Sequence, residues 1–217
     1  MAGLNPKALH VGFLLLVLLS ADFATGCVIT IRNRCSYSVT ACAQSGSGPV
    51  SRYNVGAGGS QAMNFGSSCS WPDGIIFPSV GGQCTDRNLA NIAEFTLGGF
   101  ANSDYYDLSN INAYTIGLEI RPTQIAGGAT PGGMRCGSPK CVINDIRGFC
   151  QPNNYIVQHP TGALTCVNRD GTAGVQGSAG TRQFKNACPS SYSYPDDGAT
   201  SLYNCPTGTN YDVVFCP

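Results

Sequence analysis

Twelve cysteines constrain this chain more than any other feature of its sequence. All twelve lie between residues 27 and 217. An even number of cysteines behind an export signal is typical of a disulfide framework, which forms in an oxidising compartment. Such bridges stabilise a fold by about 2–5 kcal/mol each. No Cys-x-x-Cys pair occurs, so a structural zinc site is not expected, and we expect neither a metal nor another cofactor.

The first 26 residues have the pattern of a secretory signal peptide. Lys7 precedes the stretch VGFLLLVLL at 11–19, which is too short to span a bilayer. Small residues at 24–26 suit cleavage after Gly26, with Ala24 as the alternative site. An N-terminal membrane anchor is a second interpretation, and a bacterial lipobox ending at Cys27 is a third. Lipidation of Cys27 would leave an odd number of cysteines, so a signal peptide at 1–26 and one secreted, extracellular domain at 27–217 are predicted.

Charge and composition exclude several classes of protein. Lys and Arg together number 12, as do Asp and Glu; removing 1–26 takes away Lys7 and Asp22 and keeps the balance at zero. There is no basic run, so a nucleic-acid partner is not expected. Abundant glycine (28 residues) and few helix-forming stretches favour an all-β protein. His159, the one histidine after residue 26, precedes Pro160 and suggests an exposed loop rather than a catalytic triad.

The N-terminal third is expected to contain short strands and turns. Residues 27–35 are rich in β-branched side chains, and 36–43 are predicted to return beside them as a hairpin. Cys27 and Cys42 flank that hairpin, which predicts that they pair. A Gly/Ser-rich loop is predicted at 45–59, a strand at 61–65, a turn at 69–74 with Trp71 packed on it, and a buried strand at 75–77. Cys69 and Cys84 bracket this piece and are predicted to pair.

Two later segments alternate like strands. ANIAEFTL at 90–97 directs Ala93, Phe95 and Leu97 to one face and Glu94 to the other, and YYDLS at 105–109 directs Asp107 outward. Antiparallel pairing would bring both carboxylates to one face. A carboxylate pair is what glycoside hydrolysis needs, and the alternative is two solvated acids on a strand face. A short helix is predicted at 181–188.

The C-terminal stretch CPSSYSYPDDGATSLYNCPTGTNYDVVFCP, at 188–217, resembles the C-terminus of thaumatin-like (PR-5) proteins. That family has a CPxxYSYPxDD run, then a TCP-type cysteine and a final VxFCP. GCVITIRNRCSYSVTACA at 26–43 resembles the family's opening, ANIAEFTL its TLAEFTL, and YYDLS its DxxDxS segment. A further cysteine block of the longer plant members is absent after Cys166. The resemblance implies a thaumatin-like β-sandwich with a disulfide-rich loop lobe.

Counting alone cannot choose among the pairings that twelve cysteines allow. The resemblance implies four of them: Cys35–Cys216, Cys136–Cys205, Cys141–Cys188 and Cys150–Cys166. The two local pairs named above complete the set.

Family members carry an acidic cleft formed by an Arg, a Glu and three Asp. On this chain the resemblance puts the Glu at Glu94 and the Asp residues at Asp107, Asn112 and Asp197, with Ile75 in place of the Arg. We therefore expect Glu94, Asp107, Asn112 and Asp197 to bind a ligand, and only Glu94 and Asp107 are candidates for catalysis. Tyrosine rings that suit stacking on sugar are Tyr105, Tyr106, Tyr114, Tyr192, Tyr194 and Tyr203.

The resemblance implies a defence or stress-response protein of the apoplast or cell wall. Binding of fungal or cell-wall β-glucan through the acidic cleft is the first expectation. A weak endo-β-1,3-glucanase and an inhibitor of a secreted enzyme are the alternatives, and a membrane protein is a further conceivable partner. A monomer is expected.

Overall fold

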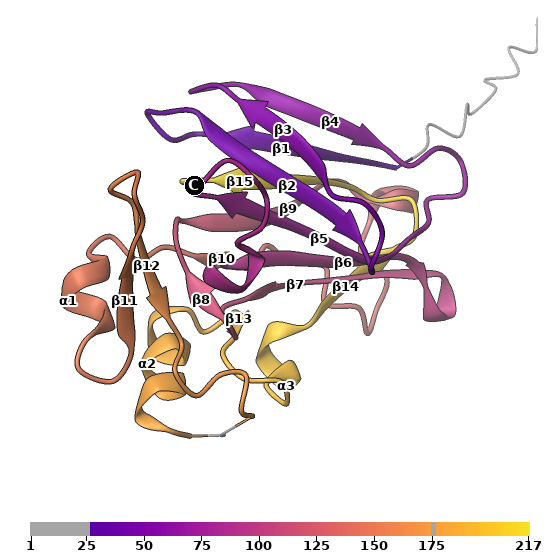
Figure 1. The fold of residues 1–217 in the computed structure, drawn as a ribbon. Helices are drawn as coiled ribbons and strands as arrows, with labels where there is room; N and C mark the ends of the chain where they lie inside the picture. The colour runs from indigo at the N-terminus through magenta and orange to yellow at the C-terminus, as the bar shows by residue number, and fades with distance from the viewer. Residues whose placement is uncertain (1–26, 175–176) are drawn as a thin grey trace, which may run out of the picture.

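The computed structural model describes residues 27–174 and 177–217, so the predicted signal peptide lies outside the described residues. Two sheets face each other, and a small third sheet lies at one end with α1 and α2 (Figure 1). The five-stranded sheet contains, in spatial order, β10 (Lys140–Cys141), β9 (Leu118–Gln124), β15 (Asn210–Phe215), β1 (Val28–Asn33) and β4 (Ser60–Asn64).

The larger sheet has seven strands, and β14 (Tyr203–Pro206) pairs with its strand β7. Its path runs through β13 (Ser191–Tyr192), β7 (Ser103–Ser109), β6 (Ile92–Gly99), β5 (Trp71–Ser79), β2 (Val39–Ser45) and β3 (Ser51–Val55). The small sheet contains β11 (Tyr155–Gln158), β12 (Leu164–Val167) and β8 (Ala113–Tyr114). The helices are α1 (Ile146–Cys150), α2 (Ala179–Ala187) and α3 (Gly198–Ser201), with single turns η1 (Arg87–Leu89), η2 (Phe100–Asn102) and η3 (Ala126–Gly128).

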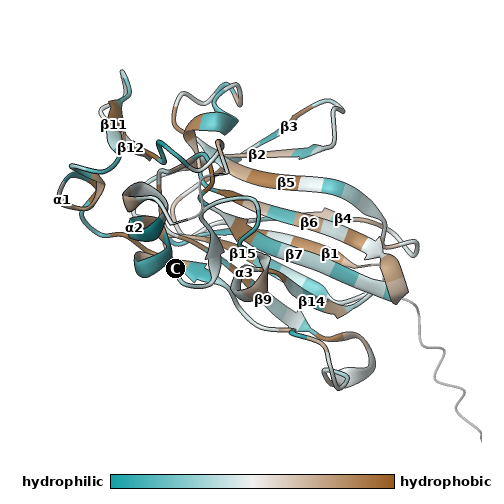
Figure 2. Ribbon diagram, turned by 90° about the horizontal axis from the view of Figure 1, so that it is seen from below, coloured by the Kyte–Doolittle hydropathy of each residue, from teal (hydrophilic) through white to brown (hydrophobic). Residues whose placement is uncertain are grey.

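The all-β prediction is confirmed, and the core lies between the two sheets. Along the strands, side chains alternate between this core and the outside, which Figure 2 shows as hydrophobic and hydrophilic bands on β6. Phe95, Tyr106 and Leu108 are buried on the inner face, as the alternation predicted. Trp71 does not pack on its own loop: it joins this core, with its ring centroid 5.0 Å from that of Phe65.

The predicted N-terminal hairpin is wrong. β1 pairs with β4 and, in parallel, with β15, whereas β2 lies in the other sheet between β3 and β5. Both segments have an apolar inner face, Ile29 and Ile31 on β1 and Val39 and Ala41 on β2. These faces meet across the sandwich instead of lying side by side, because burying both against each other removes more apolar surface from water.

The disulfides follow from this arrangement. The four pairs implied by the family resemblance are confirmed. The predicted pairs Cys27–Cys42 and Cys69–Cys84 are wrong, since the bridges are Cys27–Cys69 and Cys42–Cys84. Cys27 and Cys42 sit at strands of different sheets, so they cannot approach each other as hairpin neighbours would.

The other predictions of helices, strands, loops and turns are confirmed only in part. The helix predicted at 181–188 is confirmed as α2, which starts two residues earlier, where the Ser178 side chain accepts a hydrogen bond from Thr181 N. The strand at 61–65 corresponds to β4. The loop predicted at 45–59 instead contains β3, and the turn at 69–74 is taken up by the start of β5. None of the helices in the described ranges has the length and apolar character needed to cross a membrane.

Buried Asp104 on β7 should make stability depend on pH. Its side chain accepts hydrogen bonds from Gly98 N (2.8 Å) and Tyr211 Oη (3.1 Å), yet burial raises its pKa to about 6. The folded state therefore holds a proton that the unfolded chain has released above pH 4, so stability should fall as pH rises from about 4 to about 6. One such proton contributes at most about 1.4 kcal/mol per pH unit. Guanidinium unfolding at several pH values should give a flatter profile for Asp104→Asn; an unchanged profile would contradict this origin.

Candidate functional site

Glu94 and Asp107 are brought together on the outer face of the larger sheet. β6 and β7 run antiparallel with Glu94 directly opposite Asp107, as the alternation of both segments predicted. On the other side of β6, Ile75 of β5 lies opposite Glu94. The position where the resemblance places an arginine is therefore next to the carboxylate pair, and an uncharged isoleucine occupies it.

Asp107 is buried and Glu94 is half-buried, and their carboxyl groups are hydrogen-bonded to each other. Burial raises the pKa of Glu94, and burial together with the charge of Glu94 raises the pKa of Asp107 well above its usual value. Two carboxylates in contact, one of them buried, cannot both ionise easily. The pair therefore retains a proton to higher pH than either acid would alone, and it offers both a donor and an acceptor. Asp107 Oδ1 has no hydrogen-bond partner among the described residues.

A groove of about 300 Å³ runs over the pair. Its walls include the ring of Tyr105, a tyrosine that the sequence analysis had proposed for sugar stacking. Asp73, Thr96 and Leu202 also line it, and the sequence analysis had assigned a role to none of them. The Asp-Gly turn just before the buried strand at 75–77 was a usable signal for Asp73, whereas Leu202 comes from a distant loop. No Lys or Arg lines the groove in the ranges that the structure describes, so it is acidic. We name it the acidic groove.

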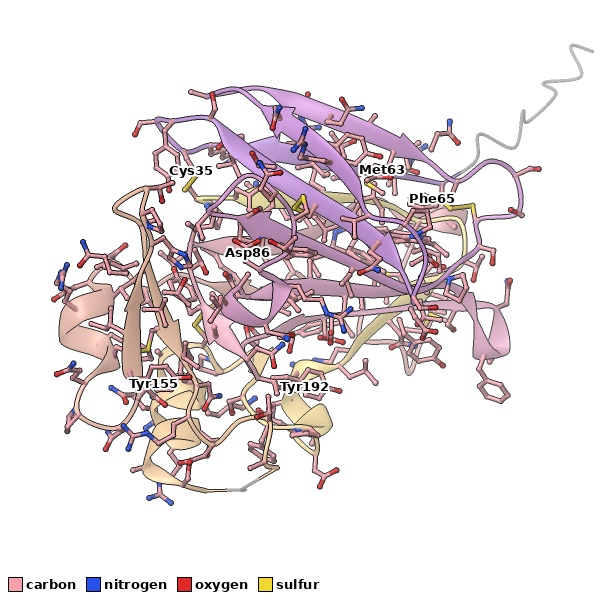
Figure 3. The ribbon with its side chains drawn as sticks, in the orientation of Figure 1. Cys35, Met63, Phe65, Asp86, Tyr155 and Tyr192 are labelled. Carbon is pink, nitrogen blue, oxygen red and sulfur yellow. A yellow bond between two sulfur atoms is a disulfide. The ribbon has the colours of Figure 1, made fainter. Side chains whose placement is uncertain are left out.

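Asp197 does not line the acidic groove. Its Oδ1 lies 2.8 Å from Lys185 Nζ of α2, and its Oδ2 accepts hydrogen bonds from Ser193 N and Oγ, both at 3.0 Å. Its carboxylate is thus used within the protein. Tyr192 lies on β13 (Figure 3), and burial, with the charges of Asp107, Glu94 and Asp197, raises its pKa to about 12.

Asn112 lies elsewhere as well. It lines a separate hollow of about 310 Å³ together with Asn88, Tyr155 and Arg169, while its backbone oxygen accepts a hydrogen bond from Asn168 N. Of the four ligand-binding residues predicted, the structure thus brings together Glu94 and Asp107 only. Tyr106, Tyr114 and Tyr203 are buried, so their rings do not offer a face to a ligand.

Within the described ranges, no group of three or more His, Cys, Asp and Glu side chains is arranged to hold a metal ion. The side chains that line the acidic groove offer hydrogen bonding, carboxyl groups with raised pKa values and an aromatic ring.

The chain is similar to several known proteins. The family model described as "Thaumatin family" matches residues 79–217. A thaumatin-like protein of Actinidia deliciosa is 32% identical over 237 residues, covering 97% of this chain and 98% of its own length. Zeamatin of Zea mays is 34% identical over 145 residues, which cover 62% of this chain and 60% of the length of zeamatin. The solved structure of the elicitor MoHrip2 from Magnaporthe oryzae aligns with a TM-score of 0.46 at 15% identity, covering 88% of this chain and 100% of that one. Given the family match and the end-to-end relative, this chain belongs to the thaumatin family, as the motifs of its tail indicated.

Proposed function

We propose that this protein is a secreted, defence-related member of its family that binds neutral β-glucan of a cell wall in the acidic groove. Export is supported by the sequence pattern of residues 1–26 and by the six disulfides, which suit an oxidising extracellular compartment. The observation that carries the binding proposal is the direct opposition of Glu94 and Asp107 across β6 and β7.

The groove's hydrogen-bonding chemistry suits a polyhydroxylated, uncharged ligand. A carboxyl pair with one retained proton can both donate to and accept from sugar hydroxyls, and the Thr96 hydroxyl can do the same. The ring of Tyr105 supplies an apolar surface beside these groups. A sugar ring has an apolar face and hydroxyl groups at its edges, so a site that binds it needs both an apolar surface and hydrogen-bonding groups.

The same geometry argues against an efficient glycosidase. The carboxyl groups of retaining enzymes stand about 5–5.5 Å apart, and those of inverting enzymes farther still, so that a sugar or a water fits between them. Glu94 and Asp107 are hydrogen-bonded to each other instead. Ile75 lies beside them, and among the described residues no Lys or Arg lines the groove to separate the two acids. We therefore expect binding without appreciable hydrolysis.

Inhibition of a secreted enzyme is the second candidate, and one feature favours it. Phe100, at the tip of the loop between β6 and β7, is 86% exposed, and its backbone oxygen accepts a hydrogen bond from the hydroxyl of groove residue Tyr105. An exposed aromatic on a defined turn is the kind of side chain that anchors protein interfaces. A partner using it would also meet the acidic groove, and its affinity would depend on salt.

The binding proposal can be tested with soluble β-1,3-glucan (laminarin). Glu94→Ala should weaken binding about tenfold, since one hydrogen bond to a charged group contributes about 1.5 kcal/mol. Glu119→Ala, which removes the chain's other glutamate from the outer face of the five-stranded sheet, is the matched control and should bind as the unmodified protein does. Isothermal titration calorimetry at low and physiological salt should give affinities within about threefold, because little charge pairing is screened.

Three results would contradict this proposal. Equal affinity in Glu94→Ala would remove the groove from the binding site. Reducing ends released at a rate typical of dedicated glucanases, and lost in Glu94→Ala, would favour the enzyme. Salt-sensitive binding of a basic protein, with none of glucan, would favour the inhibitor.

A further inference from the structure

A second cavity, of about 630 Å³, opens where the sandwich meets the tip of the β11–β12 hairpin. Its walls come mainly from three separate parts of the chain: the segment that leads into the start of β2, the end of β5 with the loop that follows, and the hairpin tip. Ile116, between β8 and β9, completes the lining. Residues that represent these walls are Tyr37, Thr40, Pro78, Ser79, Ile116 and Thr161.

The first wall presents Tyr37 as a fixed platform. Asn33, 1% exposed, donates from Nδ2 to the backbone oxygen of Tyr37 at 2.7 Å and accepts from Cys35 N through Oδ1 at 2.9 Å. The Cys35–Cys216 disulfide anchors the same turn. The backbone of Tyr37 is thus held while 53% of the residue remains exposed. A ring presented this way loses little further freedom when a ligand stacks on it.

The second wall is the loop that follows β5. Asp86, labelled in Figure 3, accepts a hydrogen bond from Val80 N at 3.0 Å through Oδ2. Cys84 N donates to Ser79 Oγ at 3.1 Å, and the Cys42–Cys84 disulfide ties the loop to β2. This wall is therefore preformed as well.

The third wall is the hairpin tip, which is closed by a tight turn. His159 N donates to Ala163 O, and Gly162 N donates to His159 O, both at 2.9 Å. Thr165 Oγ1 lies 2.9 Å from His159 Nε2 and donates to Leu89 O at 3.0 Å. These contacts fix the hairpin against the segment that leads into β6.

A further hollow of about 360 Å³ shares Tyr37, Ile116 and Ala163 with this cavity. Tyr37 therefore contributes to the lining of both hollows. The smaller hollow also has Asp145 and Arg147, one side chain of each charge, in its lining. An extended ligand fits this shape better than a compact one does. We name the two hollows together the Tyr37 groove.

The lining of the 630 Å³ cavity indicates the chemical class of the ligand. In the described part of the chain, its walls include no charged side chain, so nothing there would compensate the desolvation of an ionic ligand. Apolar surface from Pro78 and Ile116 alternates with hydroxyls such as those of Thr40 and Thr161. Tyr37 is the single aromatic among these walls, whereas grooves for proline-rich peptides are lined by several aromatics.

We propose that the Tyr37 groove is a second carbohydrate site, which takes a neutral oligosaccharide chain with one sugar stacked on Tyr37. It is separate from the acidic groove: Ile75 and Ser79 lie on the same face of β5, roughly 13 Å apart, with buried Phe77 between them. Binding here does not require that the acidic groove bind glucan. If both sites bind one polymer, the second contact becomes intramolecular and raises the overall affinity.

Titration of the ¹⁵N-labelled protein with laminarihexaose, followed by NMR, tests the proposal. Tyr37→Ala should weaken binding at the Tyr37 groove about tenfold, and Tyr37→Phe should stay within about twofold because the ring remains. Tyr155→Ala is the matched control: Tyr155 is a comparably exposed tyrosine (45%), well separated from Cys35 and Asp86 in Figure 3, and its removal should change nothing. Shifts at residues 37–40 and 79–82 should persist in Glu94→Ala.

The possible outcomes distinguish this site from the acidic groove. Loss of these shifts in Tyr37→Ala alone supports the Tyr37 groove whatever Glu94→Ala does. Equal binding by Tyr37→Ala, with loss in Glu94→Ala, overturns the second site and leaves the first. Absence of any shift at 37–40 and 79–82, equally tight binding of hexagalacturonate, or Tyr37-dependent binding of decaproline in place of the sugar would each overturn it.

Discussion

Replacing both Cys35 and Cys216 with serine is expected to lower the free energy of unfolding by about 5 kcal/mol. This disulfide joins positions 181 residues apart, and the entropy that a bridge removes from the unfolded chain grows with the size of its loop. It also ties the turn after β1 to the residue that follows β15, the two strands that pair in parallel at the centre of the five-stranded sheet. Guanidinium unfolding of the otherwise oxidised protein measures the loss.

The Cys150–Cys166 bridge provides the matched comparison, because it spans 16 residues. Its double serine variant should lose about 3 kcal/mol, less than the Cys35–Cys216 variant. Using both serines in each variant avoids a free thiol that could exchange with other bridges. If the short bridge proved the more stabilising of the two, loop entropy would not be the main contribution of the long one.

The long-range pairing of Cys35 with Cys216 could be predicted, whereas the partners of Cys27 and Cys42 could not. The reason is that the tail cysteines sit in motifs specific enough to carry a family's connectivity with them. Cys27 and Cys42 were assigned from local symmetry, which assumes that consecutive strands are neighbours in one sheet. In this protein β1 and β2 belong to different sheets, and an apolar alternation alone does not tell which partner will cover it.

The candidate site, too, could be predicted from the sequence only in part. Glu94 and Asp107 could be placed on one face because strand alternation and antiparallel register fix the side on which they lie. That two neighbouring carboxyl groups without a cation hold a proton to higher pH could also be expected from the sequence. The burial of Asp107, which raises its pKa further, depends on the neighbouring strands and could not be read from either segment. Asp73 and Leu202 reach the acidic groove from β5 and from the residue after α3, so only the tertiary fold brings them there.

The missing arginine has a structural consequence. In this chain a cation, Lys185, pairs with Asp197, the acid that lies outside the acidic groove. Glu94 and Asp107 have Ile75 beside them instead, and they reduce their repulsion by retaining a proton. The groove is thus less negative than its carboxyl groups imply, and this supports the proposed preference for a neutral ligand.

Asp197→Asn is expected to destabilise the protein by about 3 kcal/mol. The side chain of Asp197 is 6% exposed and that of Lys185 is 23% exposed, so the substitution leaves a largely buried ammonium without its counter-charge. Lys185 Nζ also donates to Ser191 O (3.1 Å) and Ser201 Oγ (2.8 Å). If Lys185 moves away once its counter-charge is removed, α2 loses its contacts with both β13 and α3. Thermal and guanidinium unfolding of Asp197→Asn, Lys185→Met and the double variant give the coupling energy, and the double variant should lose less than the sum of the single ones.

The Arg32–Asp212 pair is the control for this cycle, because its arginine side chain is 43% exposed and exposed pairs contribute about 0–1 kcal/mol. Arg32→Ala should therefore cost far less than Asp197→Asn. The resemblance to other family members had placed Asp197 in the ligand cleft, and the same variant separates the two roles. If Asp197→Asn kept full stability but lost laminarin binding, Asp197 would belong to the binding site, and the structural role argued from its pairing with Lys185 would be wrong. A large loss of stability with binding retained at low temperature is the result that its buried contacts predict.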